Sequence, residues 1–246
     1  MLMKKSLRCI RWFLAGNLVG ALVFFCFAST RFAVRNLQFV NAGFLPAYLL
    51  LDCEKQYQNA NFFTFPRRVV TRKFETHPDV KSIRVSSRLP DSITFQLTPR
   101  QPFVVLVDGQ GGYVVDADGL LYRRVDPLVV ALTEMPLLRW KTEGWRPFRV
   151  GDKLPGESVS ILHDFLDDVT RTGIGSVREV ELDDLGNLSF STVSGVSVKL
   201  GQREDRHQRL EFVDSFLRKL RQMNHGATSI DARVLHGMVW KPVVDE

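Results

Sequence analysis

The chain has 246 residues and a formal net charge of +6 at pH 7. Six of its 33 Lys and Arg residues lie in residues 1–35, a stretch that contains no Asp or Glu. The other basic residues are matched by 27 acidic ones, so residues 36–246 carry no net charge. This balance argues against a polyanion-binding face, and therefore against a nucleic-acid-binding protein. The length beyond residue 35 is enough for one large or two small domains.

Residues 12–28 form an uncharged apolar run with one strongly polar interruption, Asn17. As a helix this run would be about 25 Å long, and Ser29 and Thr30 would extend it to about 28 Å. A bilayer core is roughly 30 Å thick, so the sequence predicts a single transmembrane helix over residues 12–30. The basic residues that precede it place residues 1–11 in the cytoplasm as a tail, and everything after the span outside.

A cleaved signal peptide is the alternative, because it also joins a basic start to an apolar middle. The run is longer than the usual signal-peptide core of about 7–15 residues. Phe25 and Phe27 also break the small-residue cleavage pattern, so an uncleaved anchor is favoured. Of the three cysteines only Cys53 lies beyond the anchor, and no intrachain disulfide is expected there. Cys53 sits in an apolar run, which favours a buried thiol over a reactive or intermolecular one.

Hydrophobic periodicity predicts a small β-α-α-β-β domain over residues 33–101. Strands are expected at 32–40, 83–85 and 93–97, and helices at 45–58 and 67–76. The last strand alternates most clearly, with Ile93, Phe95 and Leu97 on one face and polar residues on the other. We therefore expect a three-stranded sheet covered by two helices on one side.

The hydrophobic pattern of residues 102–246 predicts a larger, β-rich domain. The fold class predicted for the chain is therefore α+β. Its strands are expected at 103–107, 113–115, 120–122, 129–132, 137–140, 177–182, 187–192, 196–200 and 228–234. Amphipathic helices are expected at 158–172 and 202–223, packed on a mixed sheet. A turn at His236-Gly237 and the segment 238–240 close the chain.

Motifs that would carry chemistry are weak throughout. The five histidines lack metal-ligand spacing or a cysteine partner. Residues 116–119 resemble the start of a calcium loop, but its twelfth position is Pro127 instead of a carboxylate, which favours a hairpin turn. Residues 109–112 are not followed by the helix start of a phosphate loop. The sequence thus predicts no catalytic, cofactor-binding or metal-binding residue, no cofactor and no small-molecule substrate.

The strand expected at 228–234 would lie at the end of the mixed sheet. An edge strand presents free backbone N–H and C=O groups, which a partner strand can bind. Trp240 follows closely, and a large aromatic residue in that position serves either core packing or an interface. The function that the residues favour is therefore binding through a folded surface.

Three groups of residues carry a resemblance to a known family. Residues 77–85, 89–93 and 99–102 resemble the end of the polypeptide-transport-associated (POTRA) domain of the bacterial division proteins FtsQ and DivIB. Residues 115–119 resemble the hairpin that opens the second domain of these proteins. Residues 198–201, 229–233 and 239–242, with the long helix between them, resemble the end of that domain. The resemblance covers essentially the whole chain.

The resemblance implies a non-catalytic, single-pass protein of the inner (cytoplasmic) membrane, placed at the division septum. It implies a POTRA domain at 33–101 that contacts other division proteins, and an FtsQ-type β domain at 102–246. The last strand of that domain would receive a strand from an FtsB-like protein, which arrives with an FtsL-like protein. The partner-binding residues carried over to this chain are Ser229, Ile230, Asp231, Ala232, Arg233 and Trp240. Ser229 stands where some relatives have an aromatic residue.

Two alternatives remain open at this point. A POTRA-bearing component of secretion or outer-membrane assembly would continue into many further membrane-inserted strands, and no such alternating tract follows here. A membrane-anchored exported enzyme would show a deep pocket with converging Asp, His or Ser side chains.

Overall fold

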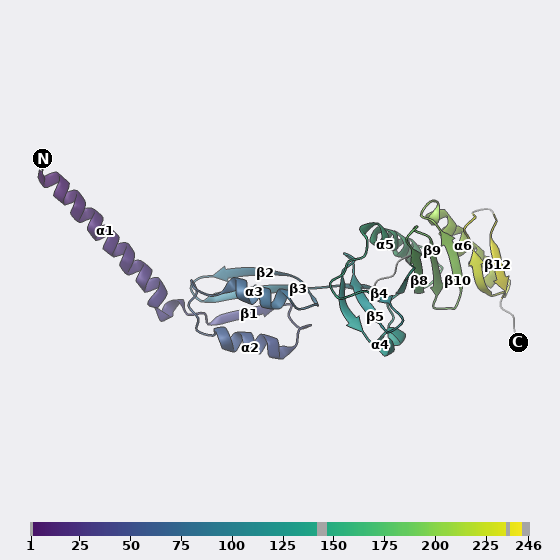
Figure 1. Ribbon diagram of the computed structural model, residues 1–246, viewed down its shortest axis with the longest axis horizontal. Helices are drawn as coiled ribbons and strands as arrows, with labels where there is room; N and C mark the ends of the chain where they lie inside the picture. Colours follow the sequence, from purple (N-terminus) through teal and green to yellow (C-terminus); the bar gives the residue numbers. More distant parts are fainter. Residues whose placement is uncertain (1, 142–146, 235–236, 243–246) are drawn as a thin grey trace. The chain divides into compact units, whose positions relative to one another are not determined.

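The computed structural model describes residues 2–141, 147–234 and 237–242, with side chains from Trp12 onward. The fold is α+β, with six α-helices and a large mixed sheet in the described part of the chain. The chain divides into two compact units, Met1–Arg100 and Gln101–Glu246. Figure 1 shows the elements of both units along the chain. Of the expected turn at His236-Gly237, His236 lies outside the described residues.

The first unit begins with helix α1 (Leu2–Ala28), followed by a 3₁₀ turn, η1 (Thr30–Phe32). The helix starts ten residues before the expected span, so the predicted tail is helical. Within the described residues, no helix combines the length and the apolar character that crossing a membrane would require. The Asn61 side-chain amide donates hydrogen bonds to the carbonyls of Cys26 (2.9 Å) and Phe27 (3.0 Å), two of the open acceptors at the helix end.

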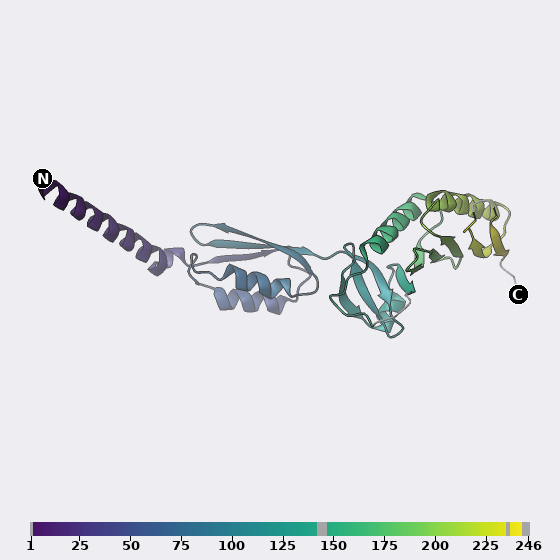
Figure 2. The same cartoon turned by 45° about the horizontal axis from the view of Figure 1, so that its top comes forward.

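The expected β-α-α-β-β order is observed in the rest of this unit. Its elements are β1 (Asn36–Val40), α2 (Ala47–Tyr57), α3 (Arg67–Glu75), β2 (Val80–Arg88) and β3 (Ser92–Pro99). The sheet has the order β1-β3-β2, with β1 parallel and β2 antiparallel to the central strand. Figure 2 shows α2 and α3 on one side of it.

The period-two pattern of β3 explains the core of this unit. Ile93, Phe95 and Leu97 are fully buried. Phe95 stacks on Phe39 of β1 with ring centroids 5.5 Å apart, and Phe39 also contacts Phe74 of α3 at 5.2 Å. The apolar faces of one helix and two strands thus meet in a single cluster, which is the expected way to bury a one-sided sheet.

The second unit contains one nine-stranded sheet. Its elements are β4 (Pro102–Val107), β5 (Gly112–Asp116), β6 (Leu121–Val125), α4 (Pro127–Leu132), β7 (Leu137–Lys141), α5 (Gly156–Arg171), β8 (Val177–Asp183), β9 (Leu188–Thr192), β10 (Ser197–Gly201), α6 (Arg206–Gln222), β11 (Ala227–Asp231) and β12 (Val239–Pro242). The strand order is β12-β11-β10-β9-β8-β7-β4-β5-β6.

Helices α5 and α6 run along one side of the part of this sheet that ends in β12 (Figure 2). Their apolar stripes enter the core, where Phe165 of α5 contacts Phe190 of β9 with ring centroids 5.1 Å apart. Leu210 and Val213 of α6 are fully buried in the same cluster. The amphipathic pattern of both helices is thereby explained.

One expected strand is a helix instead. The segment 129–132 lies in α4, which begins at Pro127, a residue whose fixed φ suits the first helical turn. Arg178 of β8 donates hydrogen bonds to the carbonyls of Ala131 (3.0 Å) and Thr133 (2.9 Å), at the end of that helix. These two acceptors would be open in an isolated helix, so the contact with the sheet stabilises the helical turn.

Candidate functional site

The candidate site is the end of the nine-stranded sheet formed by β10, β11 and β12. Strand β11 pairs in parallel with β10, with Val198 opposite Ile230. On its other side it pairs antiparallel with β12, where Trp240 lies opposite Ile230 and Val239 opposite Asp231. In the described part of the chain β12 is therefore the edge strand, and β11 is internal.

This arrangement corrects the prediction that the strand at 228–234 is a vacant edge. The chain continues past Asp231 and returns, so that β12 occupies the backbone groups that were expected to be free. This strand could not be predicted from the sequence because it has only four residues, too few for a clear alternation of apolar and polar side chains. At this end of the sheet, the strand without a second neighbour among the described residues is β12, residues 239–242.

The predicted partner-binding residues therefore have different surroundings. Ile230 (1% exposed) and Ala232 (2%) belong to the hydrophobic core and offer no surface to a partner. Ser229 and Asp231 are half-buried, and Arg233 is exposed. The structure thus separates core positions from surface positions in a segment that the sequence treated as one.

Asp231 and Arg233 are engaged with each other. The Arg233 guanidinium donates from Nη2 to Asp231 Oδ2 at 2.6 Å and from Nε to Oδ1 at 2.9 Å. This hydrogen-bonded pair lowers the pKa of the Asp231 carboxyl and raises the pKa of Arg233. A two-point contact of this kind fixes the chain just where it leaves β11, and so holds the start of the return to β12.

Trp240 is half-buried on β12 and contacts Phe216 of α6. Their rings lie edge to face, with centroids 5.8 Å apart and planes at 69°. Trp240 packs against the core cluster of the second unit while part of its ring remains accessible. It therefore attaches the edge strand to the helix layer, and the accessible part borders the open edge.

The open edge itself was missed in the sequence. Val239 is 66% exposed, and Lys241 and Pro242 are exposed as well. Backbone groups along one side of β12 point away from β11, as they do in any edge strand. Pro242 offers no N–H, so donors for an added strand come from the residues before it. The sequence signal that could have indicated a strand here was Val239 followed by Trp240, since β-branched and aromatic residues are enriched in strands.

Groups that suggested chemistry have structural roles. The turn at 116–119 is a hairpin turn, in which Asp116 Oδ1 accepts hydrogen bonds from the backbone N–H of Asp118 (3.0 Å) and Leu120 (2.9 Å). His163 stacks on Phe103 with ring centroids 4.1 Å apart. Among the described residues no group of three His, Cys, Asp or Glu side chains is arranged to hold a metal ion.

Comparison with known proteins gives two similar sequences and no matching family model. The cell division protein FtsQ of Syntrophotalea carbinolica is 23% identical over 228 residues, which are 87% of this chain and 76% of that protein. The cell division protein FtsQ of Hahella chejuensis is 25% identical over 189 residues, which are 74% of this chain and 61% of that protein. Both alignments cover most of the chain. These two similarities support an FtsQ/DivIB-family cell-division protein.

Proposed function

We propose that the chain is a non-catalytic scaffold of the division machinery, which links FtsB-like and FtsL-like proteins by β-strand addition. The observation that carries the proposal is the open edge at β12, at the end of a nine-stranded sheet. An added strand gains backbone hydrogen bonds in a fixed register, and the exposed side chains beside it supply apolar contact. The acceptor is β12, one strand beyond the segment at 229–233.

Two features favour pairing at this edge. Trp240 fastens β12 to α6, so the strand is held in place before a partner arrives, which lowers the entropic cost of binding. Val239 presents a β-branched apolar side chain at the edge, and its strand has no negative charge. Short edge strands that carry Lys or Pro tend to resist pairing, and β12 has four residues that include Lys241 and Pro242. Pairing at this edge therefore depends on Val239 and Trp240.

We also propose that α1 is the membrane anchor of the protein, with residues 1–11 in the cytoplasm and residues 33–246 outside. The support is the exposed apolar surface of the helix, where Trp12 is 79% exposed and Phe13 and Phe24 are each 73% exposed. Side chains of this kind are unfavourable in water over several turns and favourable in lipid. Anchoring confines the second unit to the membrane surface and raises its effective concentration toward other anchored proteins.

The β-α-α-β-β part of the first unit is, in this proposal, a POTRA domain that contacts other division proteins. Two observations support this: the order of its elements, β1-α2-α3-β2-β3, and the resemblance carried by residues within 77–102. The two units then give the scaffold two separate surfaces on one anchored chain. The division septum of the inner membrane is the expected location.

Capture of partners by the full-length chain tests the proposal. Val239→Lys places a charge on the open edge, and we expect it to weaken capture of FtsB-like and FtsL-like proteins by about tenfold, or about 1.4 kcal/mol. Val193→Lys is the matched control, because Val193 is 68% exposed in the turn that follows β9. Equal capture by both variants would contradict strand addition at β12.

The anchor has a separate test. Membranes that contain the full-length chain are washed at alkaline pH, which strips peripheral proteins. We expect the chain to stay with the lipid, because moving the apolar side chains of α1 from the bilayer into water would raise their free energy. Recovery of the chain in the wash would contradict a spanning anchor while leaving the proposal for β12 intact.

A further inference from the structure

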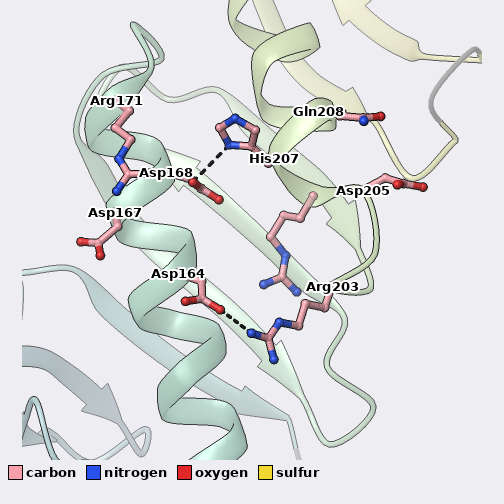
Figure 3. A pocket seen from close by; sticks show the side chains of 9 residues that line it. Asp164, Asp167, Asp168, Arg171, Arg203, Asp205, His207 and Gln208 are labelled. Carbon is pink, nitrogen blue, oxygen red and sulfur yellow. Dashed lines mark hydrogen bonds and ion pairs between the residues drawn. The ribbon is translucent and has the colours of Figure 1, made fainter.

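A charged cleft of about 440 Å³ lies between α5 and the start of α6, and the proposed function does not use it. Figure 3 shows its labelled side chains, which come from α5, from the segment that leads into α6 and from the first turn of α6. The residues that matter here are Asp164, Asp167 and Asp168 of α5, and Arg203, Arg206 and His207 around the start of α6.

Two pairs of titratable side chains connect the two sides of this cleft. Arg203 donates to Asp164 Oδ2 at 2.6 Å, and His207 Nδ1 lies 3.1 Å from Asp168 Oδ1. Figure 3 marks both contacts, which join α5 to the start of α6 and to the segment before it. These residues therefore have partners within the chain and need no ligand.

Arg206 is different. Its side chain lines the cleft, yet the residue is only 4% exposed. Its Nη2 donates weakly to the carbonyl of Gly186 at 3.4 Å, while Nε and Nη1 have no hydrogen-bond partner among the described residues. Burial lowers the pKa of Arg206, which reflects the cost of keeping its charge away from water. A buried cation with unused donors is destabilising unless an acceptor reaches it.

The N-terminus of α6 also favours a hydrogen-bond acceptor in the cleft. The helix begins at Arg206, and the preceding Asp205, with φ of 54°, makes no side-chain capping bond. The first N–H groups of a helix point out of its end and carry a partial positive charge. The buried guanidinium and the uncapped helix end thus both favour an oxygen ligand with negative charge.

The acidic residues of the cleft decide the class of that ligand. Asp167, Asp205 and Arg171 also line it and take part in neither of the two pairs described above, so the carboxylates outnumber the guanidinium groups along the lining. A phosphate dianion or a polyanion would be repelled by this carboxylate rim, whereas one carboxylate matches the charge of one guanidinium. We infer that the cleft between α5 and α6 binds a small molecule through a carboxylate group, with Arg206 as its principal contact.

The test uses the full-length chain in detergent micelles and the nitrogen-15 NMR signal of the Arg206 side-chain Nε–H group. The signal is assigned by its loss in Arg206→Met. The probes are acetate, glycine and inorganic phosphate, each added at constant ionic strength against chloride. We expect acetate or glycine to shift the signal with saturation, and to bind more tightly than phosphate.

Two variants complete the experiment. In Arg206→Met we expect the Kd for the same carboxylate to rise by about tenfold or more, as for a lost hydrogen bond to a charged group. Arg218→Met is the matched control, because Arg218 lies on the same helix, is 63% exposed and pairs with Asp214 outside the cleft. It should leave the Kd unchanged.

The inference is overturned if none of the probes shifts the Arg206 signal, if phosphate binds more tightly than both carboxylates, or if Arg206→Met binds as well as the original chain. Should Arg206→Met fail to fold, the signal is assigned by its loss in Arg206→Lys, and the titration of the unmodified chain still decides between these results. The capture assay for division partners is independent, since no lining residue of the cleft lies on β12.

Discussion

Ile230 and Trp240 lie opposite each other in the antiparallel pair of β11 and β12. Ile230 is buried in the core, while Trp240 spans from the core to the surface through its contact with Phe216. Ile230 therefore stabilises the core of the second unit, whereas Trp240 connects that core to the open edge. Substitutions at the two positions should have different consequences.

Ile230→Ala should destabilise the second unit. The side chain is 1% exposed and its loss leaves a cavity between sheet and helices, which costs about 2–5 kcal/mol for a change of this kind. Urea denaturation of the full-length chain would measure the loss. Val234→Ala is the control, because Val234 is 65% exposed and the change should cost no more than about 0.5 kcal/mol. Equal stability of the two variants would show that Ile230 is not a core residue.

Trp240→Ala should affect both stability and capture. Removing the half-buried ring takes away its contact with Phe216, and we expect a loss of about 1–3 kcal/mol in the free energy of unfolding. The loosened β12 should also bind FtsB-like partners more weakly, because it must be ordered first. Denaturation and capture are measured on the same sample. Weaker capture with unchanged stability would place Trp240 in the interface alone.

The pair of Asp231 and Arg233 predicts a pH dependence. Hydrogen bonding to Arg233 lowers the pKa of Asp231 below its ordinary 3.8, so the folded state favours the ionised carboxyl. The stability that this supplies is present above the pKa of the unfolded chain and is lost as the pH falls through the folded value. Asp231→Asn should therefore have a stability that falls less in acid than that of the original chain. An equal loss of unfolding free energy in the two proteins as the pH falls would contradict the pairing.

Cys53 should be inert in the folded protein. Its side chain is fully buried, and burial raises the pKa of the thiol to about 11. Because only the thiolate reacts, an alkylating agent at pH 8 should leave Cys53 unmodified until the first unit is unfolded. Mass spectrometry of the labelled peptides gives the result. Rapid labelling under native conditions would show that the thiol is accessible.

The elements with strong periodicity could be predicted from the sequence, and the end of the chain could not. Residues 93–97 alternate so clearly that both the strand and its buried face were evident. The segment 129–132 contains residues typical of strands, but Pro127 and the contact with Arg178 stabilise a helix there. Tertiary contacts of this kind are invisible in a single sequence.

The candidate site shows the same limit. Trp240 was a candidate, but its contact with Phe216 joins residues far apart in the chain and could not be derived from spacing. Strand β12 is short, and pairing with β11 defines it more than its own residues do. The cleft residue Arg206 was also missed, because on a charged helix face it has the same pattern as an exposed arginine.

Hydrogen exchange at β12 tests the central claim most directly. Backbone amide exchange is measured in the full-length chain, alone and bound to an FtsB-like partner. Strand addition predicts that outward-facing amides among Val239, Trp240 and Lys241 become protected on binding, because they then donate to the added strand. A bound complex in which these amides exchange as fast as in the free chain would contradict the account.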